Sequence, residues 1–384
     1  MSRDNHSDWD PQAATEQQGQ LPAYDEMRAR CPVAHDQHQH WTLFRHQDVM
    51  RVLQDHQSFS NAVSVHLSVP NGMDPPEHTH YRRLIEPYFD AETMAAFEPQ
   101  CRALAQGLTQ AIVGHKPVEL MSSFAQTFAL QVQCAFLGWD LAMQEPLREW
   151  ARKNQQAIKA QDRPALTAIA EEFSAYIQTL LAERRAAGAN APDDITTRLL
   201  REQVHGRPLS DNEIVSILRN WTAGEIGTIA ASVGTIVHFL AENIVLQNEL
   251  REHPEKLREA NDEILRIHGP LLANRRVATC PVTIGDRDIA AGERLSVLWV
   301  SANRDPEVFE NPTEFRWGRN QNDNLLYGAG IHVCPGAPLA RLELCIIIEE
   351  LLAATRSIEI AAETTPLLAD YPASGFAELY VKLT

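Results

Sequence analysis

Cysteine pairs are missing from this sequence. Its 384 residues include six cysteines, and no two of them form a C-x-x-C pair. A dense disulfide scaffold and a zinc ribbon both need closely spaced cysteines, so the sequence excludes them. Isolated cysteines are typical of a reducing compartment, and we therefore expect a cytoplasmic protein.

Basic residues and long apolar runs are also scarce. Asp and Glu outnumber Lys and Arg by 51 to 34, which gives a formal net charge of -17. Because affinity for nucleic acids rests mainly on Lys and Arg, we expect no nucleic-acid partner. Residues 1–20 lack the apolar centre of a signal peptide, and polar side chains interrupt the longest apolar stretch, near residues 229–241. We therefore expect a protein without a membrane partner.

No glycine-rich loop follows a strand-like segment in the way that a dinucleotide site requires, which excludes a Rossmann domain. Residues 1–20 are polar and rich in Gln and Asp, and we expect them to be disordered. No repeat or low-complexity linker divides residues 21–384, so we expect these residues to form a single domain.

The spacing of apolar residues predicts a mainly α fold with a minor β portion. Helical spacing is almost continuous over residues 86–263. Strand-like segments occur early, at residues 40–46, and late, at residues 281–300 and 375–383.

The start of one helix is marked more sharply than the others. Ser210 and Glu213 form an S-x-x-E capping box, and apolar periodicity continues past Trp221 to about Leu246. Such a helix would exceed about 30 residues, whereas the globular mean is about 11 to 12. A helix of this length is typical of the centre of a large helical domain.

The segment Tyr327–Gly336, YGAGIHVCPG, places three glycines and a proline around Cys334, directly before an apolar helical segment. Glycines leave no Cβ, so a large flat ligand can lie against such a loop. A cysteine near a helix N-terminus is favoured as the thiolate. A thiolate beside a planar group describes an axial ligand of haem iron. The alternative is a free cysteine buried before a helix, the commonest state of a lone cysteine.

This segment resembles the cysteine loop of the cytochrome P450 family, F-x-x-G-x-[RH]-x-C-x-G, with Tyr327 in place of the usual Phe. The resemblance implies the cytochrome P450 fold, with a long central helix over the haem, and haem b as the cofactor. It assigns Cys334 as the iron ligand and places Tyr327, Gly328, His332 and Gly336 in the cofactor-binding loop. The segment RNWTAGEIGTIAASVG is similar to the haem domain of bacterial monooxygenases that fuse haem, flavin and ferredoxin modules, and to their stand-alone relatives.

Glu263 and Arg266 form an E-x-x-R pair, one helical turn apart and on one face. In the family this pair joins a later arginine, here Arg319, in a buried ion-pair network that holds the cysteine loop. E-x-x-R pairs are also common on solvated helix faces. This pair gains weight from its position before the segment ANRDPEVFENP and Cys334.

His78 and Arg82 lie at positions i and i+4 after a Pro-Pro pair, so we expect both side chains on one face of a helix. The segment resembles the family helix whose H-x-x-x-R contacts the haem propionates, and Arg276 matches the family's other propionate arginine. Two propionate charges need compensation inside a protein, and His332 is expected to share in it. The plain alternatives are a capping role for His78 and a surface position for Arg82.

The motif Ala223–Thr228, AGEIGT, carries two glycines, each at a cost of about 1 kcal/mol relative to Ala in a helix. Close packing of another helix is one explanation, and a groove for dioxygen over haem iron is the other. The family pattern is [AG]-G-x-[DE]-T. With its Thr on Thr228, Glu225 stands where Gly is usual, and Gly227 where the acid is usual. The resemblance implies that Thr228 orders a proton-carrying water. We expect either Glu225 or water alone to replace the missing acid.

The expected substrate pocket consists of small and aliphatic residues, which suits a modest apolar or aromatic substrate. It comprises Ala223, Gly224, Gly227, Leu272 and Ala273.

Two further segments carry expectations. Residues 60–72, between the early helices, are expected to form a lid over the substrate. Residues 35–40, HDQHQH, suggest a metal site, but no cysteine or carboxylate cluster completes a ligand shell. We expect a solvated loop there.

The sequence thus predicts a haem-thiolate monooxygenase that inserts one oxygen atom from O2 by hydroxylation or by O-, N- or S-dealkylation. Electrons would come from a ferredoxin and reductase, or from a fused reductase module absent from this chain, which has no C-x4-C-x2-C run. An acidic ferredoxin would need a local basic patch, with Arg82, Arg83 and Arg341 as candidates.

Three other functions are alternatives to this monooxygenase activity. The missing acid at Gly227 favours a peroxygenase driven by hydrogen peroxide. A non-catalytic haem sensor would need no proton delivery through Thr228. A helical interaction protein without cofactor would require four motifs to stand in order by coincidence, and we reject it.

Overall fold

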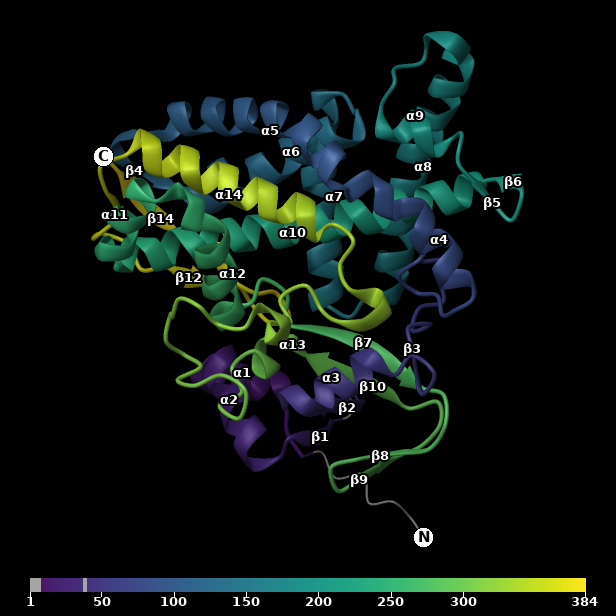
Figure 1. The fold of residues 1–384 in the computed structure, drawn as a ribbon, viewed down its shortest axis with the longest axis horizontal. Coiled ribbons are helices and arrows are strands. Elements are labelled where there is room, and N and C mark those ends of the chain that lie inside the picture. The colour runs from purple at the N-terminus through teal and green to yellow at the C-terminus, as the bar shows by residue number, and fades with distance from the viewer. Residues whose placement is uncertain (1–7, 37–39) are drawn as a thin grey trace. The chain divides into compact units, whose positions relative to one another are not determined.

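The computed structural model describes residues 8–36 and 40–384, and it divides into two compact units (Figure 1). Each unit combines segments that are far apart in the sequence. The described residues up to 66, with 71–75 and 262–334, form the first unit; residues 67–70, 76–261 and 335–384 form the second. Cys334 is therefore the last residue of the first unit, and the next residue along the chain belongs to the second.

The first unit is built around a five-stranded sheet with the order β1-β2-β10-β7-β3. Strand β10 pairs in parallel with β2 and antiparallel with β7, so early and late segments of the chain share one sheet. Leu43, Phe59 and Leu295 are among the buried residues of its core. The strands are β1 (Val33–Asp36), β2 (His40–Leu43), β10 (Arg294–Leu298), β7 (Ala273–Ala278) and β3 (Phe59–Ser60).

Short helices and a hairpin complete the first unit. In α3 (His46–Gln54), Val49, Val52 and Leu53 are buried at helical spacing, which is why this short segment folds as an amphipathic helix against the sheet. The other elements are α1 (Pro11–Gln18), α2 (Gln20–Arg30), β8 (Val282–Ile284), β9 (Arg287–Ile289), α13 (Trp299–Ala302) and the 3-10 turns η6 (Gln321–Asp323) and η7 (Gly330–His332). Helix α12 (Leu257–His268) begins in the second unit and ends in the first.

The second unit is mainly helical, and α10 (Asp211–Glu242) packs against α6, α8 and α14 (Figure 1). Helix α14 (Ala337–Ala354) also packs along α5. The remaining helices are α4 (Glu77–Ile85), α5 (Ala91–Ile112), α6 (Gln126–Leu137), α7 (Gln144–Lys159), α8 (Arg163–Ala187), α9 (Ile195–Leu199) and α11 (Ile244–Glu252). The strands are β4 (Gly114–Glu119), β5 (Gln203–Val204), β6 (Arg207–Pro208), β11 (Ile358–Ile360), β12 (Leu367–Leu368), β13 (Phe376–Glu378) and β14 (Tyr380–Leu383). The predicted mainly α fold is thereby confirmed.

The predicted capping box starts α10. The Ser210 hydroxyl accepts from the Glu213 backbone amide, and the Glu213 carboxylate accepts from the Ser210 amide. The helix ends at Glu242, and α11 starts at Ile244, so the expected extension to residue 246 is wrong by a few residues. Helix α10 is long and apolar enough to cross a membrane by length and composition, and 61% of its most apolar window is buried inside the protein. That burial accounts for its apolar character as a core helix.

Three expectations need correction. Residues 8–20 are not disordered: Asp10 caps α1, and Trp9 is 7% exposed against the ring of Phe44. The helical segment is interrupted by β4, which pairs with β14 at the end of the chain, and by the β5–β6 hairpin. The ends of the HDQHQH segment, His35 and His40, belong to the antiparallel pair β1–β2. Residues 37–39 lie outside the described part of the chain.

Candidate active site

The cysteine loop presents Cys334 on the surface of the first unit. The thiol belongs to an exposed residue, whereas Cys101 and Cys134 are buried. The Cys334 backbone amide donates to the Tyr327 carbonyl at 2.9 Å, which closes the loop around the turn η7. Helix α14 begins at Ala337, shortly after the cysteine. The alternative of a buried structural cysteine is therefore wrong, and the thiol is placed where a ligand can reach it.

Two glycines shape this loop. Gly330 has φ +69°, and a Cβ there would overlap the carbonyl oxygen of Leu53 in α3. Gly328 has φ +73°, and a Cβ there would lie 3.5 Å from the ring of Trp299. Side chains rarely adopt this left-handed conformation. The loop can thus rest directly on α3 because glycine occupies the contact.

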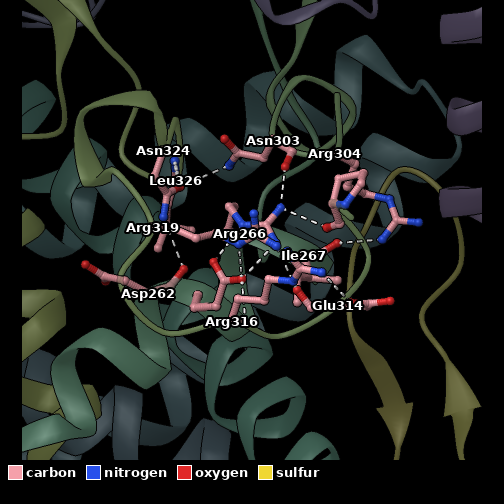
Figure 2. A network of polar contacts seen from close by, with 12 residues as sticks. Asp262, Arg266, Ile267, Asn303, Arg304, Glu314, Arg316, Arg319, Asn324 and Leu326 are labelled. Carbon is pink, nitrogen blue, oxygen red and sulfur yellow. Dashed lines mark hydrogen bonds and ion pairs between the residues drawn. The ribbon is translucent and has the colours of Figure 1, made fainter. Parts of the chain in front are cut away.

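The E-x-x-R pair forms the predicted network with the third arginine (Figure 2). Arg266 donates to both carboxylate oxygens of Glu263, at 2.7 and 2.9 Å, and Arg319 Nε donates to Glu263 Oε1 at 2.7 Å. The side chains of Glu263 and Arg266 are each only 1% exposed. Charge-assisted hydrogen bonds of this kind are the strong ones, and this pair meets the predicted ion-pair role.

The network also fastens backbone segments that sequence reasoning had not included. Arg266 Nη1 donates to the carbonyls of Asn303 and Pro312, at 2.6 and 2.9 Å, and its guanidinium lies 4.7 Å from the ring centroid of Phe309. The Asn303 side chain in turn accepts from the Leu325 amide, just before the cysteine loop. The segment ANRDPEVFENP, quoted above only as a marker of order, is thus a direct partner of Arg266.

Arg276 is a buried cation in β7. It is 3% exposed, and its Nη1 atom donates to the carbonyl of the neighbouring Arg275 at 2.8 Å. Burial lowers the pKa of Arg276 to about 10, and the charge of Asp74 offsets this only in part. Among the described residues no carboxylate forms an ion pair with it. A buried guanidinium in this state fits an anionic group such as a haem propionate.

The predicted H-x-x-x-R helix is α4, in the second unit. His78 is 3% exposed, so its side chain lies on the buried face of α4. Arg82 Nε lies 2.8 Å from Glu86 Oε1, with 13% of its side chain exposed, and is not the plain surface cation of the alternative. Arg83 is exposed and Arg341 partly exposed, so the expected basic patch stays a prediction.

One face of α10 is open at the glycine motif. Ala223, Gly224 and Gly227 are exposed in the middle of a helix that is otherwise largely buried. A Cβ at either glycine would meet nothing within 4 Å. Close packing by another described helix therefore does not explain the two glycines. The Thr228 hydroxyl donates to the Gly224 carbonyl on the same helix.

Glu225 is directed differently from its neighbours in this motif. Its Oε1 atom is buried, and the carboxyl faces Glu343 on α14. Sequence reasoning missed Glu343; the signal was an acid within the apolar sequence APLARLELCIIIEELL. Burial raises the pKa of Glu225.

The expected substrate and lid residues divide between the two units. Leu272 is 5% exposed in the first unit, while Ala273 is partly exposed. Within the expected lid, residues 67–70 bind α10 of the second unit: the Val69 amide donates to Ser216 Oγ at 2.8 Å, and Asn220 Nδ2 donates to the Val69 carbonyl at 3.0 Å. Residues 67–70, toward the end of the lid segment, are thus hydrogen-bonded to the central helix.

Within residues 8–36 and 40–384, no group of three or more His, Cys, Asp or Glu side chains could hold a metal ion. The exposed thiol of Cys334 in its glycine-shaped loop and the buried guanidinium of Arg276, which has no ion-pair partner among the described residues, instead match a cofactor that brings its own metal ligands, as haem does. These features of the chain fit haem b.

Comparison with known proteins agrees with this geometry. A family model described as Cytochrome P450 matches residues 156–359. A putative cytochrome P450, YjiB of Bacillus subtilis (strain 168), is 30% identical over 361 residues, 90% of this chain and 89% of its own. Erythromycin C-12 hydroxylase of Saccharopolyspora erythraea is 30% identical over 344 residues, 85% of each chain.

Solved structures show the same fold. A mutant of P450 EryK in complex with erythromycin B has a TM-score of 0.86 and 26% identity, over 96% of this chain and 97% of that chain. CYP109E1 from Bacillus megaterium in complex with testosterone has a TM-score of 0.84 and 26% identity, over 95% and 99%. The cysteine loop, the ion-pair network and these relatives agree: the chain belongs to the cytochrome P450 family, the haem-thiolate monooxygenases.

Proposed function

We propose that this cytochrome P450 inserts one oxygen atom from O2 into a small apolar or aromatic substrate, by hydroxylation or by O-, N- or S-dealkylation. The exposed thiol of Cys334, at the end of a glycine-shaped loop before α14, is the observation that carries the proposal. Haem b, bound through that thiolate, supplies the activation of dioxygen. Binding of the haem, placement of the substrate and delivery of protons fall to side chains of this chain.

In this proposal Arg276 and His332, together with His78 and Arg82, neutralise the haem propionates. Arg276 supports it most directly, because its guanidinium is buried and no carboxylate of the described chain forms an ion pair with it. Tyr327, Gly328 and Gly336 shape the loop that carries Cys334.

The open face of α10 is proposed to receive dioxygen and substrate. Ala223, Gly224 and Gly227 leave it free of bulky side chains, and Thr228 places a hydroxyl there that can hold a proton-carrying water. Glu225 is proposed to supply protons to this hydroxyl in place of the acid that Gly227 lacks. Leu272 and Ala273 are proposed to contact the substrate, and residues 60–72 to cover it.

Electrons are proposed to come from a separate ferredoxin and reductase, or from a fused reductase module, in a cytoplasmic setting. The fused or ferredoxin route rests on the resemblance to fusion haem domains that we infer from the sequence of residues 219–234. Hydrogen-peroxide-driven peroxygenation is the second candidate. It is favoured by Gly227, where the family's proton-relay acid is usual.

The test is the absorption spectrum of the reduced, carbon-monoxide-bound protein, compared between Cys334→Ser and Cys280→Ser. Cys280 is an exposed cysteine of the same unit outside the loop, so its replacement controls for loss of a surface thiol. We expect a strongly red-shifted Soret band in the wild type and in Cys280→Ser, and its loss in Cys334→Ser. A thiolate-type band that persists in Cys334→Ser would contradict the assignment.

A second measurement separates the two candidate functions. Product formed with NADPH, ferredoxin and ferredoxin reductase is compared with product formed with hydrogen peroxide alone, using one substrate that shifts the haem spin state. Turnover with the reductase system supports monooxygenation. Turnover with peroxide alone would favour the peroxygenase.

A further inference from the structure

Two carboxyl groups face each other inside the second unit. Glu343 lies on α14, within an otherwise apolar helix, and is 0% exposed. Glu225 lies on α10, which packs against α14. Both oxygens of Glu343 and Oε1 of Glu225 are buried, and no donor of the described chain hydrogen-bonds to them. Buried polar groups are nearly always paired, so these three oxygens need an account.

Two ionised carboxylates cannot satisfy each other, because each offers only acceptors. If one of them is protonated, its O–H can donate to the other, and the negative charges are reduced from two to one. Burial raises the pKa of both groups, and for Glu343 the charge of Glu225 and a hydrogen bond to it add to the rise. A pair of this kind titrates as one unit.

Neighbouring groups do not supply a counter-charge. Cys101 on α5 faces both carboxyls; burial and their charges raise the pKa of its thiol, which therefore stays neutral. Arg102, next along α5, is held by Glu98, Glu349 and Glu350 at 3.0, 2.9 and 2.8 Å. Among the described residues no cation acts on either carboxyl, and a shared proton is the remaining way to stabilise the pair.

The pair lies next to the proposed proton path. Glu225 is three residues before Thr228 on α10, so the two side chains lie near the same helix face. The Thr228 hydroxyl donates to the Gly224 carbonyl, one residue before Glu225. A proton held by the pair is therefore one helical turn from the hydroxyl.

We propose that Glu225 and Glu343 share one proton as a buried acid–carboxylate pair, and that Glu343 positions and reloads Glu225 as the proton donor on the Thr228 side. The use of this proton in oxygen chemistry rests on the proposed function; the existence of the pair does not. In the step, the single shared proton moves from Glu343 to Glu225 when Glu343 holds it, and Glu225 then releases it toward Thr228. The pair then carries one more negative charge until water returns a proton.

The pair itself is tested by infrared spectroscopy on the haem-loaded protein with Glu343→Gln, Glu225→Gln and Glu349→Gln. Glu349 lies on the same helix with 36% of its side chain exposed, so its variant is the matched control. We expect a protonated-carboxyl band at neutral pH in the wild type and in Glu349→Gln. Both pair variants lose it, because the new amide can donate to the remaining carboxylate. A wild-type spectrum that matches both pair variants would overturn the pair.

Stability against pH gives a second readout without turnover. A carboxyl whose pKa is raised by folding adds stability below its unfolded pKa, about 4.3, and loses that contribution as pH rises through the folded pKa. Glu343→Gln should therefore gain stability relative to the wild type as the pH rises from about pH 5 through the neutral range. Glu349→Gln should stay parallel to the wild type. A constant difference between Glu343→Gln and the wild type over this range would contradict the shared proton.

The role in catalysis is tested by product formed per NADPH and by the solvent isotope effect on turnover. Positioned acid–base groups contribute about 10²–10⁴-fold, and water can replace part of this, so we expect Glu343→Gln to lose about tenfold in coupled product. Its solvent isotope effect should rise, with an unchanged substrate-induced spin shift. Unchanged coupling in both pair variants would refute the proton-donor role. A wild type without a thiolate-type carbon monoxide spectrum would instead refute the proposed function and leave the infrared result standing.

Discussion

Replacing Glu263 with Gln removes the carboxylate that joins Arg266 and Arg319 in the network of Figure 2. The substitution keeps the size of the side chain and one carbonyl oxygen. It exchanges the other oxygen for an NH2 donor, which then faces the Arg266 and Arg319 guanidinium groups. Arg266 and Arg319, whose side chains are 1% and 10% exposed, would lose this counter-charge.

The expected loss follows from the number of contacts and their burial. Glu263 accepts from Arg266 at 2.7 and 2.9 Å, from Arg319 at 2.7 Å and from the Arg316 amide at 3.2 Å. Removing one partner of a buried ion pair costs about 3–5 kcal/mol. We expect Glu263→Gln to fall in that range, and to weaken haem retention because the network is bonded to the segment before the cysteine loop.

The matched control is Glu310→Gln in the same unit. Glu310 Oε2 lies 3.2 Å from Arg316 Nη1, but 84% of its side chain is exposed. Exposed pairs contribute about 0–1 kcal/mol, so this variant should be nearly neutral. Urea denaturation followed by circular dichroism, with and without haem, measures both variants. A difference between them of less than about 1 kcal/mol would refute the reasoning on burial.

Two further predictions concern the loop and the start of α10. Gly330→Ala should cost about 1–3 kcal/mol more than Gly292→Ala, because both glycines have positive φ but only the first would overlap a carbonyl, that of Leu53. Equal midpoints of denaturation in the two variants would contradict this. Hydrogen bonds from Arg207 and other donors hold the pKa of Glu213 well below its usual range. Its stabilisation is therefore present above the unfolded pKa and lost at lower pH, so the gap in unfolding free energy between wild type and Glu213→Gln should shrink from about pH 7 to about pH 3. A gap that is constant with pH would exclude the linkage.

Local patterns in the sequence were sufficient for several elements. The capping box set the start of α10, because Ser210 and Glu213 satisfy the orphan amides of their own helix turn. The short strand and the helix within residues 40–56 could be predicted because the spacing of apolar residues in a strand differs clearly from that in a helix. Both signals depend only on residues a few positions apart.

Elements that are stabilised by residues distant in the sequence were harder to predict. Strand β4 pairs with β14 from the end of the chain, and nothing in its own sequence GHKPVE marks it as a strand. Residues 8–20 were expected to be disordered from their polar composition. Their order comes from Trp9 against Phe44 and from Asp8, which accepts from the His35 amide at 2.8 Å. Such contacts cannot be predicted from amino-acid composition.

The sequence by itself determined the family, the cysteine in its glycine-rich loop, and the acid–arginine pair with its third partner, because these depend on residue types at fixed spacings. The tertiary structure decided what each of them touches. It showed why Gly330 must lack a side chain, which carbonyls Arg266 fastens, and that the acid displaced from its usual position, Glu225, faces Glu343. Such meetings join residues from separate helices, and only packing brings their charges into one low-dielectric interior.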